Sequence, residues 1–198
     1  MLTKIEKPLL AWYDSGHRDL PWRQNKEAYR IWVSEIMLQQ TRVEAVKDYF
    51  LRFTKELPSV EALFEVEEEK LLKLWQGLGY YNRARNLKKA AEVMVKEYEK
   101  TLPDNYETLK TLPGIGDYTA GAIASIAYQQ PVPAVDGNVL RVYMRYFARE
   151  DDISRDATKK QVQKELLEVI PKEAPGDYNQ ALMEIGALCC IPNGKPLC

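Results

Sequence analysis

Apolar residues recur every three to four positions along most of the chain, which is the spacing that places side chains on one face of an α-helix. Residues 28–53 show this spacing with Ile31, Ile36, Val46 and Phe50, among others. Further segments with the same spacing are 60–74, 83–98, 118–128, 138–147, 157–170 and 178–188. Prolines fall between these segments, where they end helices without breaking them. Patterns typical of strands are few, so the sequence predicts an all-α protein.

Composition narrows the class of protein only slightly. The chain has 198 residues, which is enough for one domain or for two small ones. No apolar run is long enough to span a bilayer, and the N-terminal residues lack the apolar region of a secretory signal. We therefore expect a cytoplasmic protein with no membrane partner. The formal net charge of −1 weighs against a nucleic-acid binder, although the distribution of charge matters more than its sum.

A glycine-rich turn joins two helical segments at residues 112–120 (LPGIGDYTA). Gly114 and Gly116 let the backbone turn tightly and approach a partner closely. The helix that follows begins with unpaired backbone N–H groups, which suit a phosphate. Shortly afterwards, residues 135–139 (VDGNV) place the carboxylate of Asp136 at the start of another helix. A turn that can bind a phosphate, followed by a carboxylate at the start of a helix, suggests chemistry on a nucleic acid.

Two carboxyl groups are candidates for that chemistry. Glu35 lies in the strongly apolar stretch 31–38, where burial would raise its pKa and let it act as a general acid near neutral pH. The alternative is a partly exposed Glu on the polar side of an amphipathic helix. The helix N-terminus would keep Asp136 ionised, although an Asp at this position is often only a cap. One protonated and one ionised carboxyl group is the pattern that cleaves glycosidic bonds.

Several motifs in order along the chain resemble one known family. They are residues 18–23 (RDLPWR), 34–41 (SEIMLQQT), 77–81 (GLGYY), 112–120, 135–139 and 179–181 (NQA). Together they resemble adenine DNA glycosylases of the MutY type, in the helix-hairpin-helix superfamily of base-excision DNA glycosylases. The resemblance implies two helical domains with the active site in the cleft between them. Residues 21–130 would form a six-helix barrel with the helix-hairpin-helix, and residues 1–20 with 131–198 an iron–sulfur-type domain.

The resemblance also implies roles for individual residues. Glu35 would protonate the adenine ring, Asp136 would stabilise the cationic sugar, and Asn138 would orient Asp136. Tyr118 stands where relatives similar to endonuclease III carry a lysine that forms a Schiff base with the sugar and cuts the strand, and a phenol cannot form an imine. We therefore expect a monofunctional glycosylase, whether or not Tyr118 does more than pack.

A further set of residues would act on the duplex, because a base must be rotated out of the stack before it is cut. Those expected to contact DNA are Gln39, Gln40, Leu78, Tyr80, Gly114, Gly116 and Thr119. For Leu78 and Tyr80 the alternative is core packing. A monovalent cation at the hairpin is a further expectation. Arg18 and Arg23 flank a Pro-Trp turn and could line the purine pocket or hold Glu35.

All three cysteines, Cys189, Cys190 and Cys198, lie in the last ten residues, which favours metal or cluster ligands over disulfides. Buried thiols are the alternative. The resemblance implies that Cys190 and Cys198 are the first two of four ligands of a [4Fe–4S] cluster. We expect a truncated chain with an incomplete or absent cluster, lacking the C-terminal domain in which relatives recognise 8-oxoguanine.

The expected function is hydrolysis, by a monomer, of the N-glycosidic bond of adenine mispaired with 8-oxoguanine or guanine in double-stranded DNA. Glu35 in its Leu-Gln-Gln-Thr context favours adenine. A thymine-mismatch glycosylase of the same superfamily is the alternative within the enzyme class. A non-catalytic helix-hairpin-helix DNA-binding fragment is the alternative outside it.

Overall fold

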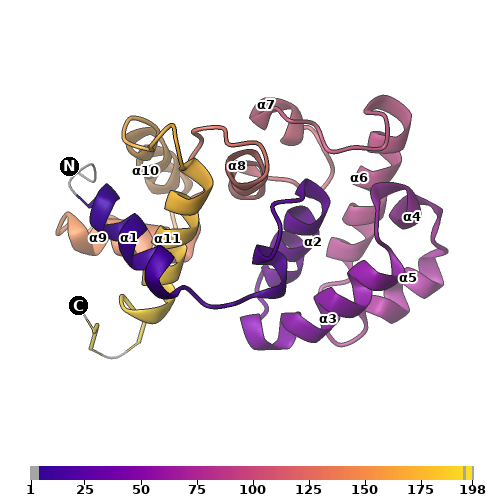
Figure 1. Cartoon of the computed structure of the whole chain (residues 1–198), viewed down its shortest axis with the longest axis horizontal. Helices are drawn as coiled ribbons and strands as arrows, with labels where there is room; N and C mark the ends of the chain where they lie inside the picture. Colours follow the sequence, from indigo (N-terminus) through magenta and orange to yellow (C-terminus); the bar gives the residue numbers. More distant parts are fainter. Residues whose placement is uncertain (1–4, 194, 198) are drawn as a thin grey trace. The chain divides into compact units, whose positions relative to one another are not determined.

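The computed structural model describes residues 5–193 and 195–197, and within these residues it contains helices and no strands (Figure 1). This confirms the all-α prediction. The helices are α1 (Glu6–Gly16), the short 3-10 helix η2 (Pro21–Arg23), α2 (Ala28–Leu38), α3 (Val43–Glu56), α4 (Val60–Glu65), α5 (Glu68–Trp75), α6 (Asn82–Glu97), α7 (Tyr106–Leu109), α8 (Asp117–Ile126), α9 (Gly137–Tyr146), α10 (Asp156–Leu167) and α11 (Pro175–Leu188). None of the helices in the described part of the chain is long and apolar enough to cross a membrane.

The chain divides into two compact units. One is Asp19–Ile123, and the other joins Met1–Arg18 to Ala124–Cys198. The division between the units falls within α8. The sequence had led us to expect it several residues later, at Pro131. Asn179 of α11 explains the difference. Its amide donates to Ser125 Oγ at 2.8 Å and to the Val132 carbonyl at 2.9 Å, which groups the end of α8 with the C-terminal helices.

The unit Asp19–Ile123 is built around large aromatic side chains. Here α4 packs on α6, and α3 packs on α2 and α5. Trp32, Phe50, Phe53 and Trp75 are fully buried, and the rings of Phe53 and Trp75 meet edge to face at 5.9 Å. Apolar area of this size supplies most of the driving force for folding. The six-helix barrel that the resemblance implies for this region stays a prediction.

Two helical segments are each broken in a way that the apolar spacing does not show. The pattern over residues 28–53 becomes α2 and α3, separated at Gln40, which has a φ of 57°. The pattern over residues 60–74 becomes α4 and α5. The Lys88 ammonium donates to the carbonyls of Phe64 and Val66, which satisfies the open end of α4. Lys88 belongs to α6, so this contact comes from a segment that is distant in sequence.

The unit that contains both chain ends packs α11 against α1 and α9, and α10 against α9. Its core includes Leu9, Tyr143, Val162, Tyr178 and Leu182.

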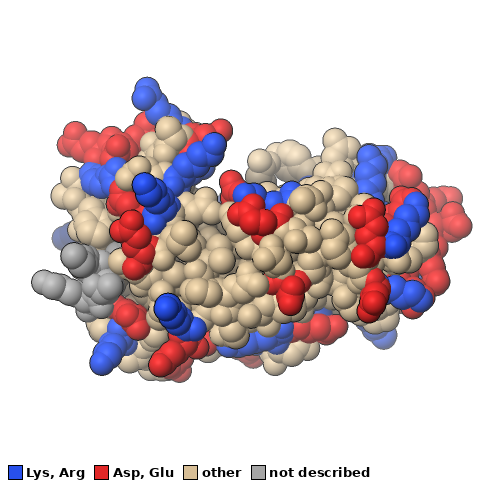
Figure 2. Space-filling view, turned by 90° about the horizontal axis from the view of Figure 1, so that it is seen from above, with Lys and Arg blue, Asp and Glu red and all other residues tan. Residues whose placement is uncertain are grey.

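Acidic and basic side chains are intermixed on the face of the molecule shown in Figure 2. Ion pairs between exposed side chains contribute little to the free energy of unfolding, so most of the stability comes from the apolar cores.

Gly176 provides a test of the packing of α11. A Cβ at this position would lie 2.7 Å from both Ile126 Cα and the Ser125 carbonyl oxygen, which are backbone atoms that cannot move aside cheaply. We expect Gly176→Ala to destabilise the chain by about 1–3 kcal/mol, as overpacking does. The control is Gly16→Ala, where a Cβ meets nothing within 4 Å. Thermal unfolding followed by circular dichroism measures both, and equal melting temperatures would contradict the packing argument.

Candidate active site and nucleic-acid interface

Glu35 is buried in the apolar helix α2. Glu35 is 7% exposed, and every residue from Ile31 to Met37 is buried with it. The alternative of an exposed Glu on a polar helix face is therefore wrong. A buried carboxyl group needs a hydrogen-bond partner, because leaving it unpaired is costly. The sequence supplies that partner from a distant segment.

Tyr118, in the first turn of α8, is that partner. Its hydroxyl donates to Glu35 Oε2 at 2.6 Å, across 83 positions of sequence. The distance lies within the usual range for a hydrogen bond between a hydroxyl and an oxygen acceptor. Two residues that the sequence analysis singled out separately thus meet within the unit Asp19–Ile123. The phenol does more than pack, because it fixes one oxygen of Glu35.

The glycine-rich hairpin places Tyr118. Leu112 and Ile115 are buried and anchor the loop, and the Ile115 N–H donates to the Leu112 carbonyl at 3.2 Å. Gly114 has a φ of 79°, and a Cβ there would lie 2.8 Å from Asn86 Cβ on α6. Gly116 is exposed, and a Cβ there would meet nothing within 4 Å. The loop therefore presents backbone at Gly116, beside the N-terminus of α8, where an anion is favoured.

Thr119, also expected to contact DNA, is 2% exposed. Its side chain is therefore inside the unit, and a contact with DNA at this position would have to come from the backbone. The cation expected at the hairpin stays a prediction.

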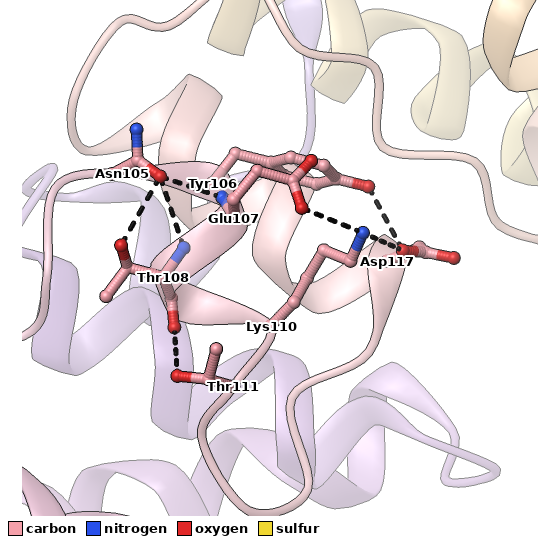
Figure 3. A network of polar contacts seen from close by, with 7 residues as sticks. All are labelled: Asn105, Tyr106, Glu107, Thr108, Lys110, Thr111 and Asp117. Atoms are coloured by element: carbon pink, nitrogen blue, oxygen red, sulfur yellow. Dashed lines mark hydrogen bonds and ion pairs between the residues drawn. The ribbon is translucent and has the colours of Figure 1, made fainter.

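A polar network ties α7 to the start of α8 on the other side of the hairpin (Figure 3). The Asn105 side chain accepts from the N–H groups of Glu107 and Thr108 and so caps α7. Lys110 pairs with Asp117 at 3.1 Å, and the Tyr106 hydroxyl donates to the same carboxylate at 3.2 Å. These contacts hold both helices that flank the hairpin.

A pocket of about 340 Å³ opens in the same unit and contains three of the residues expected to contact DNA. Gln39, Gln40 and Tyr80 line it, together with Tyr81, Asn82 and Arg83. Tyr80 is 64% exposed, which is unusual for a ring of this size. Leu78 differs, because it is 6% exposed and belongs to the core. The core-packing alternative is thus correct for Leu78 and wrong for Tyr80.

Asp136 caps α9. Its Oδ1 accepts from the Val139 N–H at 2.8 Å, and its Oδ2 accepts from Asn138 Nδ2 at 2.6 Å, so Asn138 orients it as expected. Both bonds lower the pKa of Asp136. Burial raises it by more, and the pKa of this carboxyl is above its ordinary value. Desolvation is therefore the larger of the two opposing effects on this pKa, and the expectation that Asp136 is ionised stays a prediction.

Arg141, which the sequence analysis did not single out, supports Asn138 from the next turn of α9. Its Nη2 donates to Asn138 Oδ1 at 2.9 Å and to the Gly186 carbonyl at 2.6 Å, and its Nε donates to the Cys190 carbonyl at 2.7 Å. This guanidinium joins the Asp136 site to the C-terminal end of α11. Only the tertiary contacts separate Arg141 from the other arginines of the chain.

Arg18, expected in a purine pocket or beside Glu35, forms an ion pair with a residue of α11, and its place in a pocket stays a prediction. Its guanidinium forms a two-pronged ion pair with the fully buried Glu184 through Nε and Nη2, each at 2.8 Å. A forked pair of this kind holds the guanidinium in one orientation. Arg23 ends η2, and its place in a pocket stays a prediction.

The cysteines do not form a cluster site within the described residues. Cys190 is buried, and its Sγ lies 3.3 Å from Arg145 Nη1. Cys198 lies outside the described residues. No group of three or more potential ligands gathers in the part of the chain that the structure describes. A [4Fe–4S] cluster takes four thiolates and the chain has three cysteines, so these residues do not fit the group by themselves.

Comparison with known proteins agrees with these observations. The family model of the HhH-GPD superfamily base excision DNA repair protein matches residues 33–172. Adenine DNA glycosylase of Mus musculus is 43% identical over 206 residues, with 100% of this chain and 40% of the mouse protein covered. The protein of the same name from Buchnera aphidicola subsp. Acyrthosiphon pisum is 42% identical, with 96% and 54% covered. The chain thus spans about half the length of these relatives or less.

Solved structures of similar fold include a thermostable thymine-DNA glycosylase, which is 28% identical with a TM-score of 0.89 and covers 98% of this chain and 90% of that one. A non-covalent endonuclease III–DNA complex has a TM-score of 0.82 at 24% identity, with 98% and 89% covered, and shows the likeness of fold. The family match includes Glu35, the hairpin, Tyr118 and Asp136. The chain belongs to the HhH-GPD superfamily of base excision DNA repair proteins.

Proposed function

We propose that this chain carries the catalytic region of a monofunctional adenine DNA glycosylase, which acts on adenine mispaired with 8-oxoguanine or guanine. The observation that carries the proposal is the bond from Tyr118 to the buried carboxyl group of Glu35. This bond orients the carboxyl group of Glu35 from the first turn of α8, the helix at whose N-terminus we propose that a phosphate binds. Relatives at about 40% identity that bear the name adenine DNA glycosylase support the choice of adenine.

The proposed reaction is hydrolysis of the N-glycosidic bond. Glu35 donates a proton to a ring nitrogen of adenine, and the bond between that base and C1′ breaks with its electron pair on the base. The carboxylate of Asp136 stabilises the positive charge that develops on the sugar. The oxygen of a water molecule then bonds to C1′ and releases a proton, leaving an abasic site. The proposed mechanism requires a protonated Glu35 and an ionised Asp136.

DNA is the proposed partner. The backbone around Gly116 and the first turn of α8 suit a phosphate, since helix N-termini bind anions. The pocket lined by Gln39, Gln40 and Tyr80 offers amide groups and an exposed ring. Such groups suit the space that a flipped base leaves in the stack. Gly114 shapes the hairpin and would act without touching the duplex.

The absence of strand cleavage follows from Tyr118. The phenol stands where a lyase would need an amine, and it is already engaged with Glu35. No imine with the sugar can form there. The proposed product is therefore an intact strand with an abasic site.

A second candidate is a thymine-mismatch glycosylase. The structural likeness to a thymine-DNA glycosylase, at a TM-score of 0.89, favours it. Glu35 separates the two hypotheses, because protonation of a ring nitrogen is the route proposed for release of adenine.

The first prediction concerns substrate and product. In single-turnover reactions on labelled duplexes, we expect release of adenine opposite 8-oxoguanine and opposite guanine, with strand breaks only after hot alkali. Thymine opposite guanine should remain intact. Breaks without alkali would overturn the interpretation of Tyr118, and release of thymine would support the second candidate.

The second prediction separates the acid from its partner. Glu35→Gln keeps an acceptor for Tyr118 but has no proton to give, so we expect the rate to fall about 10²–10⁴-fold, the usual contribution of a general acid. Tyr118→Phe removes only the orienting bond, so its loss should be smaller. Both variants should bind the duplex as wild type does. Loss of binding in step with the rate would instead indicate a structural defect.

The third prediction concerns Asp136. Its raised pKa means that the folded chain holds this proton to higher pH than the unfolded chain, so stability declines as pH rises between the two pKa values. Asp136→Asn should abolish excision and, since Asn also caps helices, should match or exceed wild-type stability at pH 7. That gain should shrink towards about pH 4, near the ordinary pKa of Asp.

Asp136→Ala is the matched control for the third prediction. It removes the helix cap and should lower the free energy of unfolding by about 1 kcal/mol. Thermal melts across pH measure both variants. A gain for Asp136→Asn that grows as pH falls would show that the sign of the pKa shift is wrong.

A further inference from the structure

One guanidinium contacts two separate segments that line the pocket of Gln39, Gln40 and Tyr80. It belongs to Arg83, the second residue of α6. Its Nη1 donates to the carbonyl oxygens of Ile36 at 2.9 Å, Met37 at 3.0 Å and Gln39 at 2.5 Å. Its Nη2 donates to Thr41 Oγ1 at 3.3 Å and to the carbonyls of Leu78 at 3.1 Å and Gly79 at 3.3 Å.

The first segment is the C-terminal end of α2. The last carbonyls of a helix have no partner within it, and they carry the negative end of the helix dipole. A guanidinium there satisfies several of these carbonyls together. It also lies over the ring of Trp75, 5.4 Å from the ring centre, and Trp75 Nε1 donates to the Gly79 carbonyl at 3.0 Å.

The second observation is backbone strain at two pocket residues. Gln40 has a φ of 57° and Tyr80 a φ of 48°, in the left-handed region that costs energy for residues other than glycine. The carbonyl just before each of them, that of Gln39 and that of Gly79, is an acceptor for Arg83. Arg83 therefore fixes both peptide planes that lead into the strained residues.

We propose that Arg83 is a positioning residue, whose forked guanidinium locks Gln40 and Tyr80 in their left-handed conformations and so presents both side chains to the DNA duplex. The role in catalysis rests on the proposed function, whereas the backbone role does not. Arg83 acts through Gln40 and Tyr80, and we expect no change at Glu35 itself when Arg83 is replaced.

Lysine cannot take over this role. Its ammonium is a single point with three donors, whereas the planar fork of Arg83 reaches acceptors in two segments. A direct contact between Arg83 and a DNA phosphate would behave differently, because a lysine keeps the charge that such a contact uses. Arg83→Lys therefore distinguishes the two roles, and Arg83→Gln removes the charge as well.

The experiment compares wild type, Arg83→Lys and Arg83→Gln. The control is Arg85→Lys, on the same helix, where the arginine makes one surface ion pair with Glu68. Amide hydrogen exchange of the free chain reports the backbone. We expect protection to fall about tenfold in both segments for Arg83→Lys. The reporting amides are Thr41, which donates to the Leu38 carbonyl, and Leu78, which donates to the Trp75 carbonyl. The control and helix α3 should keep wild-type protection.

The second measurement is adenine excision under single turnover, with duplex binding measured over a range of salt. We expect Arg83→Lys to lose about 10²-fold in rate, as small misplacements do, with an unchanged salt slope. Normal protection in both segments, or loss of protection throughout α3, would overturn the proposal. So would a wild-type rate for Arg83→Lys beside a reduced salt slope for Arg83→Gln. If wild type excises no adenine while protection still falls locally, the proposed function fails and the positioning role stands.

Discussion

The burial of the Glu35 carboxyl group constrains how the helices of the unit Asp19–Ile123 can pack. Glu35 lies in a helix whose neighbouring residues are all buried, and an acid in such a place is tolerated only with a well-placed partner. Tyr118 supplies it, so the hairpin and the start of α8 must lie where the phenol can reach. The buried anchors Leu112 and Ile115 and the network of Asp117, Lys110 and Tyr106 hold that arrangement from both sides. Glu35 and the glycine-rich hairpin are thereby one structural assembly.

Open carbonyls at helix ends are the second constraint, and cations from other helices satisfy them. Arg83 does so for α2, Lys88 for α4, and Arg141 for α11. Each is a basic residue that looks like surface charge in the sequence but is committed to backbone oxygens in the structure. A net charge of −1 is therefore a poor guide to the surface that a nucleic acid would meet. Partial burial of the Arg83 guanidinium also lowers its pKa, because desolvation disfavours the charged form.

Two oppositely acting effects meet at Asp136. Hydrogen bonds from Val139 and Asn138 favour the carboxylate, and burial disfavours it more strongly. Arg141, which holds Asn138, adds a positive charge that also favours the carboxylate. A group balanced in this way is costly for stability when it is ionised.

The sequence by itself determined the helical class and the hairpin, because apolar spacing and glycine pairs are local properties of the chain. Motif order along the chain also named Glu35, Tyr118, Asp136 and Asn138 as candidate site residues. It also named Gln39, Gln40 and Tyr80, which the structure gathers at one pocket. It could not place Leu78 or Thr119 in the core, pair Arg18 with Glu184, or separate Arg83 and Arg141 from other arginines. Those outcomes depend on which segments meet, on how deeply burial shifts a pKa, and on which carbonyls a cation can reach. Only the tertiary structure decides them, since each is a contact between residues far apart in the chain.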